Sequence, residues 1–176
     1  SSDVCSSDLA EEEVAREVGS SDIAYVQVEA VLAQCDLFLN EGAALQEKTQ
    51  KAQKSWAQKE QNLQAEAAQL QEKYQKGLIT TNDAQAQQQS IEKRVASYQS
   101  SAQKEAQALD EENYVFTNRA QDLLHRAVQE INGDKKYKLI INATALIDAD
   151  STLNITPAVL AKVNELYAAD KKAVKK

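Results

Sequence analysis

The side chains that could do chemistry are few and scattered. His125 is the only histidine, and it stands beside Arg126 in a long polar segment where a solvated side chain is its ordinary role. Glu111 and Glu112 are consecutive acids in the same segment, and such pairs usually form a solvated helix face. No Gly-x-x-x-x-Gly-Lys loop is present for nucleotide phosphates, and no Cys/His group has metal-ligand spacing. The sequence therefore predicts no active site, no metal and no cofactor, and we expect a protein that is not an enzyme.

The two cysteines indicate no redox chemistry. Cys35 lies in the apolar run 31–39 and is expected to be a small buried hydrophobe. Cys5 lies near the start of the chain, and a disulfide between the two is the alternative that the sequence leaves open.

Composition favours long helices over a thick globular core. Apolar residues make up 43% of the 176 residues, but there are one Trp, two Phe and no Met, and Ala and Gln dominate the middle. Ala buries little surface, and four Gly with one Pro leave few places to turn. No apolar run reaches the roughly 18 residues of a membrane span. No signal peptide is visible, so an exported protein would be represented here in its mature form.

The net charge of −7 belongs mainly to the start of the chain. Residues 1–22 hold seven acids and one arginine, a net of −6, so that 23–176 carry only −1. Ser-Ser-Asp occurs there three times without apolar periodicity. We interpret 1–22 as a disordered acidic leader, with a non-native extension as the alternative. The basic tail 170–176 ends the chain, and no basic patch indicates nucleic-acid binding.

The middle of the chain predicts a helical hairpin. Residues 43–131 are rich in good helix formers and lack Pro. Gly77 suits the position after a helix end, while Thr80 and Asp83 have the spacing of a capping box. A helix therefore stops and another starts near 77–83. So short a connection predicts two antiparallel neighbours.

Seven-residue repeats support this pairing. The rows are Trp56, Leu63 and Leu70 in the first helix, and Val95, Ala102, Leu109, Phe116 and Leu123 in the second. A sustained repeat of this kind predicts a left-handed coiled coil with a narrow, Ala-rich seam. Ile91 and Tyr98 are interpreted as apolar residues off that seam.

A small body should flank the hairpin, built from 23–42 and 132–169. Strands are expected at 23–28, 137–142 and 145–148, and a short helix at about 30–40 that ends near Gly42. Thr156 and Pro157 have the types of a helix N-cap and first helical residue. The expected fold is thus α+β and mostly α: a long antiparallel coiled-coil hairpin inserted into a small β-sheet body.

A body of this size is marginally stable alone, so we expect it to oligomerise. The apolar residues expected to form the oligomerisation body are Ile23, Tyr25, Val26, Val28, Leu139, Ile140, Ile141, Leu146 and Ile147.

Several of these segments resemble the Skp (OmpH-like) family. Ile-Ala-Tyr-Val-Gln-Val at 23–28 resembles the family's opening strand, and Leu-Ile-Ile-Asn-Ala-Thr-Ala-Leu-Ile-Asp at 139–148 its paired C-terminal strands. The segment 154–164 resembles its closing Asp-Ile-Thr-x-x-Val-Leu helix, with Asn154 in place of Asp. Gly-Leu-Ile-Thr at 77–80 is similar to its hairpin tip. The resemblance covers about 23–166, with specific ends and a generic coiled coil between them.

The resemblance implies a homotrimeric holdase chaperone. Three bodies would form a β-rich hub, and three arms would enclose a cavity for unfolded outer-membrane or other exported proteins in the periplasm, without nucleotide. It implies no stable membrane insertion. Well-known members are strongly basic, whereas 23–176 are nearly neutral, so electrostatic client capture and lipopolysaccharide contact are not carried over.

Client contacts are expected from apolar side chains on thin arms, since many shallow tethered contacts can hold a client reversibly. The candidates are Leu78 and Ile79 at the tip, Ile91, Tyr98 and Trp56. The alternative is that they pack within the hairpin, and Trp56 fits the seam best. Leu78 and Ile79 are the exceptions, because a tip has no partner helix to cover it.

Two other protein classes remain open. A structural coiled-coil spacer or scaffold that joins defined partners would also need a hairpin, but it would not need arms that return to a sheet. A prefoldin-like chaperone also combines arms with strands, but there strands interrupt the coil at its centre. The flanking strands favour the holdase.

Overall fold

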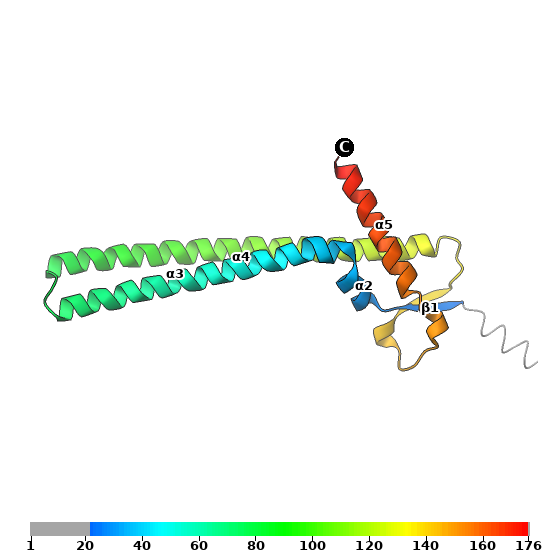
Figure 1. Ribbon diagram of the computed structural model, residues 1–176, viewed down its shortest axis with the longest axis horizontal. Helices are drawn as coiled ribbons and strands as arrows, with labels where there is room; N and C mark the ends of the chain where they lie inside the picture. Colours follow the sequence, from blue (N-terminus) through cyan, green and yellow to red (C-terminus); the bar gives the residue numbers. More distant parts are fainter. Residues whose placement is uncertain (1–21, 176) are drawn as a thin grey trace, which may run out of the picture. The chain divides into compact units, whose positions relative to one another are not determined.

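The computed structural model describes residues 22–175 (Figure 1). The predictions for 1–21, including the disordered leader and Cys5, lie outside the described residues. The elements in chain order are β1 (Ile23–Val26), α2 (Val28–Gln34), the π-helix η1 (Phe38–Gly42), α3 (Ala43–Gln75), α4 (Thr81–Ile131), β2 (Leu139–Asn142), the 3₁₀ turns η2 (Ala143–Ala145) and η3 (Ser151–Leu153), and α5 (Thr156–Val174). The predicted α+β, mostly α fold class is confirmed.

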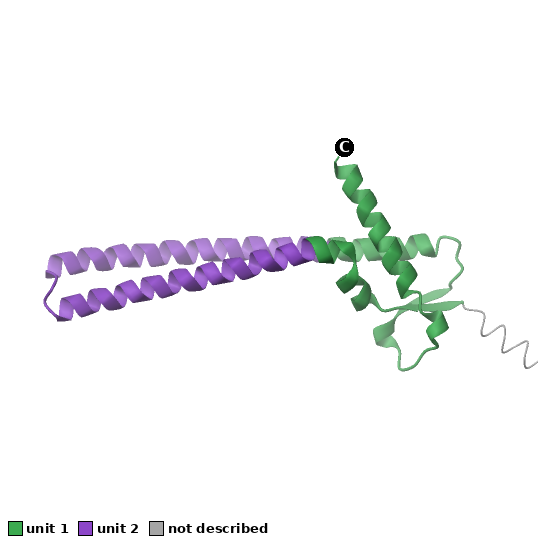
Figure 2. Ribbon diagram, viewed as in Figure 1, with its two compact units in different colours: residues 1–40, 119–176 green, residues 41–118 purple. Residues whose placement is uncertain are grey.

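The chain divides into two compact units (Figure 2). One comprises residues 1–40 and 119–176, and the other residues 41–118. The second unit contains α3 and most of α4, while α4 continues unbroken into the first. The assignment of an arm to 43–131 and a body to 23–42 and 132–169 stays a prediction.

Residues 41–118 form an antiparallel helix pair (Figure 2). Three polar pairs cross it: Lys48 with Glu112 at 2.7 Å, Trp56 with Glu105 at 2.9 Å, and Glu66 with Arg94 at 2.6 Å. As the α3 partner advances along the chain, the α4 partner retreats by nearly the same number of residues. The two helices therefore keep one register along this whole stretch.

The seam between these helices holds small and aliphatic side chains. Ala52, Leu70, Ile91 and Leu109 are buried, each 7% exposed or less. Tyr98 is half-buried. The interpretation of Ile91 and Tyr98 as lying off the seam is wrong, because 91, 95, 98 and 102 alternate by four, three and four residues and share one helix face.

The predicted turn is confirmed in detail. Gly77 has φ +70°, the left-handed conformation that a residue with a Cβ adopts only at a cost. The Leu78 N–H donates to the Lys73 carbonyl at 2.9 Å, which closes the end of α3 as in a Schellman motif. Thr80 Oγ1 accepts from the Asp83 N–H at 3.2 Å and caps the start of α4.

Gly77→Ala is expected to destabilise the protein by about 1 kcal/mol. Nothing lies within 4 Å of a Cβ added at this position, so the cost comes from backbone strain and not from a clash. Urea unfolding followed by circular dichroism at 222 nm measures it. Gly77→Asn is the control, and it should cost less because Asn tolerates this conformation. Equal stability of the Ala variant and the parent would contradict the assignment.

The sheet in the first unit has two parallel strands. Ile23 pairs with Leu139, and the register runs on to Val26 with Asn142. The strand predicted at 145–148 is wrong: Asn142 Oδ1 accepts from the Thr144 N–H at 3.2 Å, and this side-chain bond starts the 3₁₀ turn η2. β1 is also shorter than predicted, since Val28 already belongs to α2.

Two helix predictions near this sheet are also corrected. The short helix expected at about 30–40 is α2, which ends at Gln34 because Cys35 is extended, and at 42 the π-helix η1 leads directly into α3. Thr156 is not an N-cap of the expected kind: its hydroxyl accepts from the Gln27 N–H at 2.9 Å, and Asn154 Oδ1 accepts from the Thr156 N–H at 3.0 Å. Pro157 does stand in the first turn of α5, as predicted. The helix α5 runs on to Val174 and so includes most of the predicted basic tail 170–176, whose role as a separate tail stays a prediction.

The core of the first unit lies between the sheet, α2 and α5. Its largest fully buried side chains are Leu37, Val26, Val31, Val159, Val163 and Cys35. Cys35 is thus a buried free thiol, as predicted. Arg126 on α4 pairs with Asp170 on α5, and this hydrogen bond, followed by charge attraction, raises the pKa of Arg126.

Candidate functional site

The described residues offer no obvious centre for chemistry. Within 22–175, no three His, Cys, Asp or Glu side chains are grouped so as to hold a metal ion. In the same residues, no helix carries an apolar stretch sufficient to cross a bilayer. His125 is exposed, with Nε2 3.3 Å from the Gln129 amide nitrogen.

The end of the hairpin exposes a cluster of apolar side chains, here called the tip patch: Tyr74, Leu78 and Ile79. Leu78 is 72% exposed and Tyr74 is 50% exposed, while Ile79 is half-buried. Tyr74 lies in the last turn of α3, which ends at Gln75. Of the predicted client contacts, Leu78 has the most accessible surface; Ile91 is buried, and Trp56 and Tyr98 are half-buried in the hairpin.

A groove adjoins the tip patch on one flank of the hairpin. This apolar groove has a volume of about 560 Å³. Its lining is Ala67, Ala68, Leu70, Gln71 and Tyr74 from α3 and Thr81, Ala84, Gln85 and Gln88 from α4. No lining residue carries a charge, although charged residues make up 27% of the chain. Tyr74 belongs to both the groove and the tip patch, and we take the two together as the candidate site.

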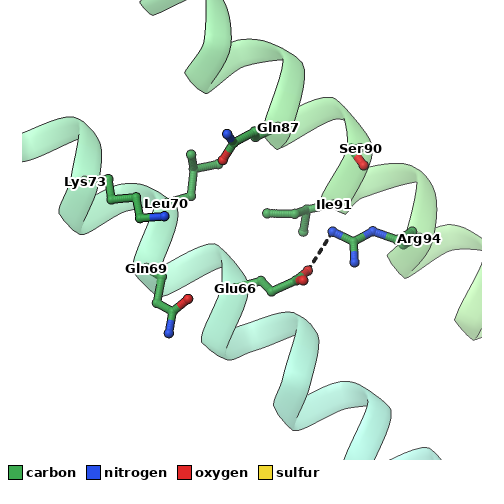
Figure 3. Close-up of a pocket in the computed structure, with 8 residues that line it drawn as sticks. All are labelled: Glu66, Gln69, Leu70, Lys73, Gln87, Ser90, Ile91 and Arg94. Atoms are coloured by element: carbon green, nitrogen blue, oxygen red, sulfur yellow. Dashed lines mark ion pairs between the residues drawn. The ribbon is translucent and has the colours of Figure 1, made fainter. Parts of the chain in front are cut away.

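The opposite flank of the same segment is chemically different (Figure 3). A hollow of about 240 Å³ lies there, with Leu70 and Ile91 between the helices and Glu66, Lys73 and Arg94 around it. Figure 3 shows the 2.6 Å ion pair that joins Arg94 of α4 to Glu66 of α3. Residues spaced by three and four positions stay on one helix face. The lining residues of each hollow follow such spacings, so each hollow belongs to a different flank of the hairpin.

Two exposed residues were missed by the sequence reasoning. Tyr114 is 70% exposed and Val115 is 56% exposed, both on α4. The heptad analysis marks the seam and so passes over apolar residues that face away from it. The available signal was their position directly before Phe116, a residue of the predicted seam row.

The first unit has an apolar surface of its own. Ile23 is 46% exposed and its register partner Leu139 is 51% exposed. Alternation places Tyr25 and Ile141 on the same sheet face, and both are half-buried. Ile147 is fully exposed in the loop beyond, Leu146 is half-buried, and Val26 belongs to the core.

A shallow groove of about 210 Å³ also lies in this unit. It is lined by Val26, Val28, Gln121, Leu124, His125, Val128, Ile140, Ile141 and Asn142. Four of the residues predicted for the oligomerisation body thus come together here: Val26, Val28, Ile140 and Ile141. Their role in assembly stays a prediction.

The family model described as "Outer membrane protein (OmpH-like)" matches residues 22–163. This chain belongs to the OmpH-like family. A solved structure of an OmpH-like protein from Caulobacter crescentus CB15, described as a candidate outer membrane chaperone, has the same fold with a TM-score of 0.69. The alignment covers 82% of this chain and 85% of that one at 16% sequence identity, so the similarity concerns the fold. No curated protein matches this chain in sequence.

Proposed function

We propose that this OmpH-like protein is an ATP-independent holdase chaperone that binds unfolded outer-membrane or other exported proteins in the periplasm. Membership of the OmpH-like family supports a chaperone role. The observation that carries the proposal is the apolar surface at the end of the hairpin, where Leu78 is 72% exposed and Tyr74 lines an uncharged groove. Apolar patches left in water mark binding surfaces.

The strength of this surface fits reversible holding. Partial burial of an apolar side chain contributes about 1 kcal/mol, so the three residues of the tip patch give about 3 kcal/mol. That corresponds to an affinity weaker than about 1 mM for one arm. Several arms in one particle would raise the effective concentration and so hold a client without any deep pocket. Release then needs no nucleotide, because each contact dissociates quickly.

Several arms require self-association, and we propose a homotrimer. The sheet face with Ile23 and Leu139 supplies an apolar surface that its own chain covers only in part. Burial of that face between copies would also stabilise a small unit with a two-stranded sheet. Three copies would place three arms around a shared cavity.

The alternative is a coiled-coil spacer that joins defined partners. The three polar pairs across the hairpin fix its register, as a spacer would need. A spacer, however, has no use for an uncharged groove beside an exposed tip. Turbidity of a urea-unfolded β-barrel protein after dilution separates the two. A holdase suppresses it near one particle per client, whereas undiminished turbidity would contradict the proposal.

Leu78→Ser combined with Ile79→Ser is expected to weaken client binding about thirtyfold, since two contacts of about 1 kcal/mol are lost, and to leave assembly unchanged. The substitutions remove apolar surface at the tip, and the Schellman bond that closes α3 uses only the backbone of Leu78. Binding of the unfolded β-barrel protein is measured by fluorescence titration. Val174→Ser is the matched control, because Val174 is 87% exposed on α5 outside the hairpin. Unchanged affinity in the tip variant would show that the tip patch is idle.

A further inference from the structure

The charged flank of the hairpin is longer than the hollow in Figure 3. A second hollow of about 330 Å³ shares Arg94 with the first and is lined by Lys59, Asn62, Leu63, Ser97, Tyr98 and Ser101 as well. Lining residues on α3 follow at 59, 62, 66, 69 and 73, and on α4 at 87, 90, 94, 97 and 101. Steps of three and four keep each set on one helix face. The two hollows are thus one elongated surface, here called the charged groove.

The charges of this groove do not cancel. It is lined by Lys59, Lys73 and Arg94 and by a single acid among the described residues, Glu66, which Arg94 already engages at 2.6 Å. Two other lysines of the hairpin, Lys48 and Lys76, have carboxylate partners at 2.7 Å. Within residues 22–175, no carboxylate forms an ion pair with Lys59 or Lys73. Two uncompensated ammonium groups therefore stand at the two ends of one groove.

The floor and walls of the groove suit a polypeptide. Leu63, Leu70, Ile91 and Tyr98 lie along the floor, and the hydroxyl and amide groups of Ser90, Ser97, Ser101, Asn62, Gln69 and Gln87 line the sides. Such side chains can bond the free backbone groups of an extended chain. Lys59 and Lys73 are fourteen residues apart, about 21 Å along a helix. An extended strand covers that distance in about six residues.

We propose that the charged groove binds extended polypeptide segments that carry two carboxylates about six residues apart with apolar side chains between them. The inference rests on the proposed holdase function and adds a selectivity to it. The apolar groove on the opposite flank takes uncharged segments, and the charged groove takes acidic ones. One hairpin would then hold two chemically different parts of the same unfolded client.

The test uses the full-length chain and two labelled twelve-residue peptides in fluorescence anisotropy. One peptide has two Asp six positions apart with Leu and Tyr between them, and the other has Asn at both positions. The Asp peptide should bind about tenfold more tightly in low salt, since each exposed ion pair adds a modest increment. High salt should abolish the difference. Equal binding of the two peptides to the parent protein would overturn the inference.

Lys59→Gln combined with Lys73→Gln should remove the preference for the Asp peptide. Lys54→Gln combined with Lys93→Gln is the matched control, because it removes two exposed positive charges from the same helices outside the groove. An equal loss in both double variants would mean a general charge effect and would overturn the site.

An anionic lipid surface is the competing partner. If vesicles containing phosphatidylglycerol retain the parent protein but not Lys59→Gln/Lys73→Gln, while the peptides are not discriminated, the groove binds headgroups and the inference fails. The turbidity assay keeps the proposed function separate. If the protein suppresses client turbidity but does not distinguish the two peptides, only the charged-groove proposal is refuted. If it distinguishes the peptides but does not suppress turbidity, the holdase proposal is refuted.

Discussion

Ile23→Asp combined with Leu139→Asp is expected to convert a particle of three chains into single chains. The two residues are register partners at the start of the parallel sheet and are 46% and 51% exposed. Burial of each between copies would stabilise the trimer by about 2 kcal/mol. A carboxylate at the same place must instead lose its hydration without a partner, which costs several kcal/mol more. Light scattering coupled to size-exclusion chromatography measures the number of chains directly.

The double variant should remain folded, because both side chains already contact water and lie on the face of the sheet away from the buried Ala24 and Val26. Far-ultraviolet circular dichroism checks this. Val174→Asp is the control, with an exposed apolar residue replaced on α5 far along the chain from the sheet. If the Asp variant stayed trimeric, or if the parent protein were a stable monomer, this sheet face would not be the assembly surface.

Leu37→Ala is expected to lower the free energy of unfolding by about 3 kcal/mol. Leu37 is fully buried and is among the largest such side chains of the unit with the sheet. Its removal leaves a cavity that close-packed neighbours refill only in part. For a domain of this size the midpoint of thermal unfolding should fall by more than about 10 °C.

The control for this variant lies two residues away. Leu39 is 57% exposed, so Leu39→Ala should change stability by less than about 0.5 kcal/mol. The pair makes the same chemical change in the same segment and differs only in burial. Similar losses in both variants would contradict the placement of the core.

The parts of the fold that local signals determine were predictable from the sequence. Gly77 adopts the left-handed conformation and Thr80 Oγ1 accepts from the free N–H of Asp83 in the first turn of α4, so the turn follows from two residue types. The heptad rows located most of the seam in the same way. Tracing one row per helix, however, misplaced Ile91 and Tyr98, because the second row of a coiled coil is offset by three or four residues.

Two other predictions failed because a polar side chain has a partner that residue type alone does not indicate. Residues 145–148 have the composition of a strand. However, the Asn142 side chain accepts a hydrogen bond from the Thr144 N–H, and the chain forms a 3₁₀ turn at 143–145 instead. Thr is a preferred N-cap residue, yet the Thr156 hydroxyl accepts a hydrogen bond from the N–H of Gln27, which is 129 positions away in the sequence. The first partner is local and the second is tertiary, and composition alone predicts neither.

The two flanks of the hairpin illustrate the same limit for the candidate site. Each groove is formed by faces of α3 and α4 whose juxtaposition depends on the register that Glu66 and Arg94 share across the hairpin. A shift of one residue would rotate other side chains into both grooves. Sequence patterns predicted Leu78 at the tip, but neither the uncharged lining beside it nor the unpaired lysines opposite.

The most direct test of the holdase is site-specific photo-crosslinking during client capture. A photoreactive amino acid replaces Leu78 at the tip, or Lys54 on the exposed surface of the same hairpin, and a urea-unfolded β-barrel protein is diluted into each variant. We expect strong crosslinks to the client from position 78, weak ones from position 54, and none to a folded control protein. Equal crosslinking from both positions, or none from position 78, would contradict the assignment of the hairpin end as the client-binding surface.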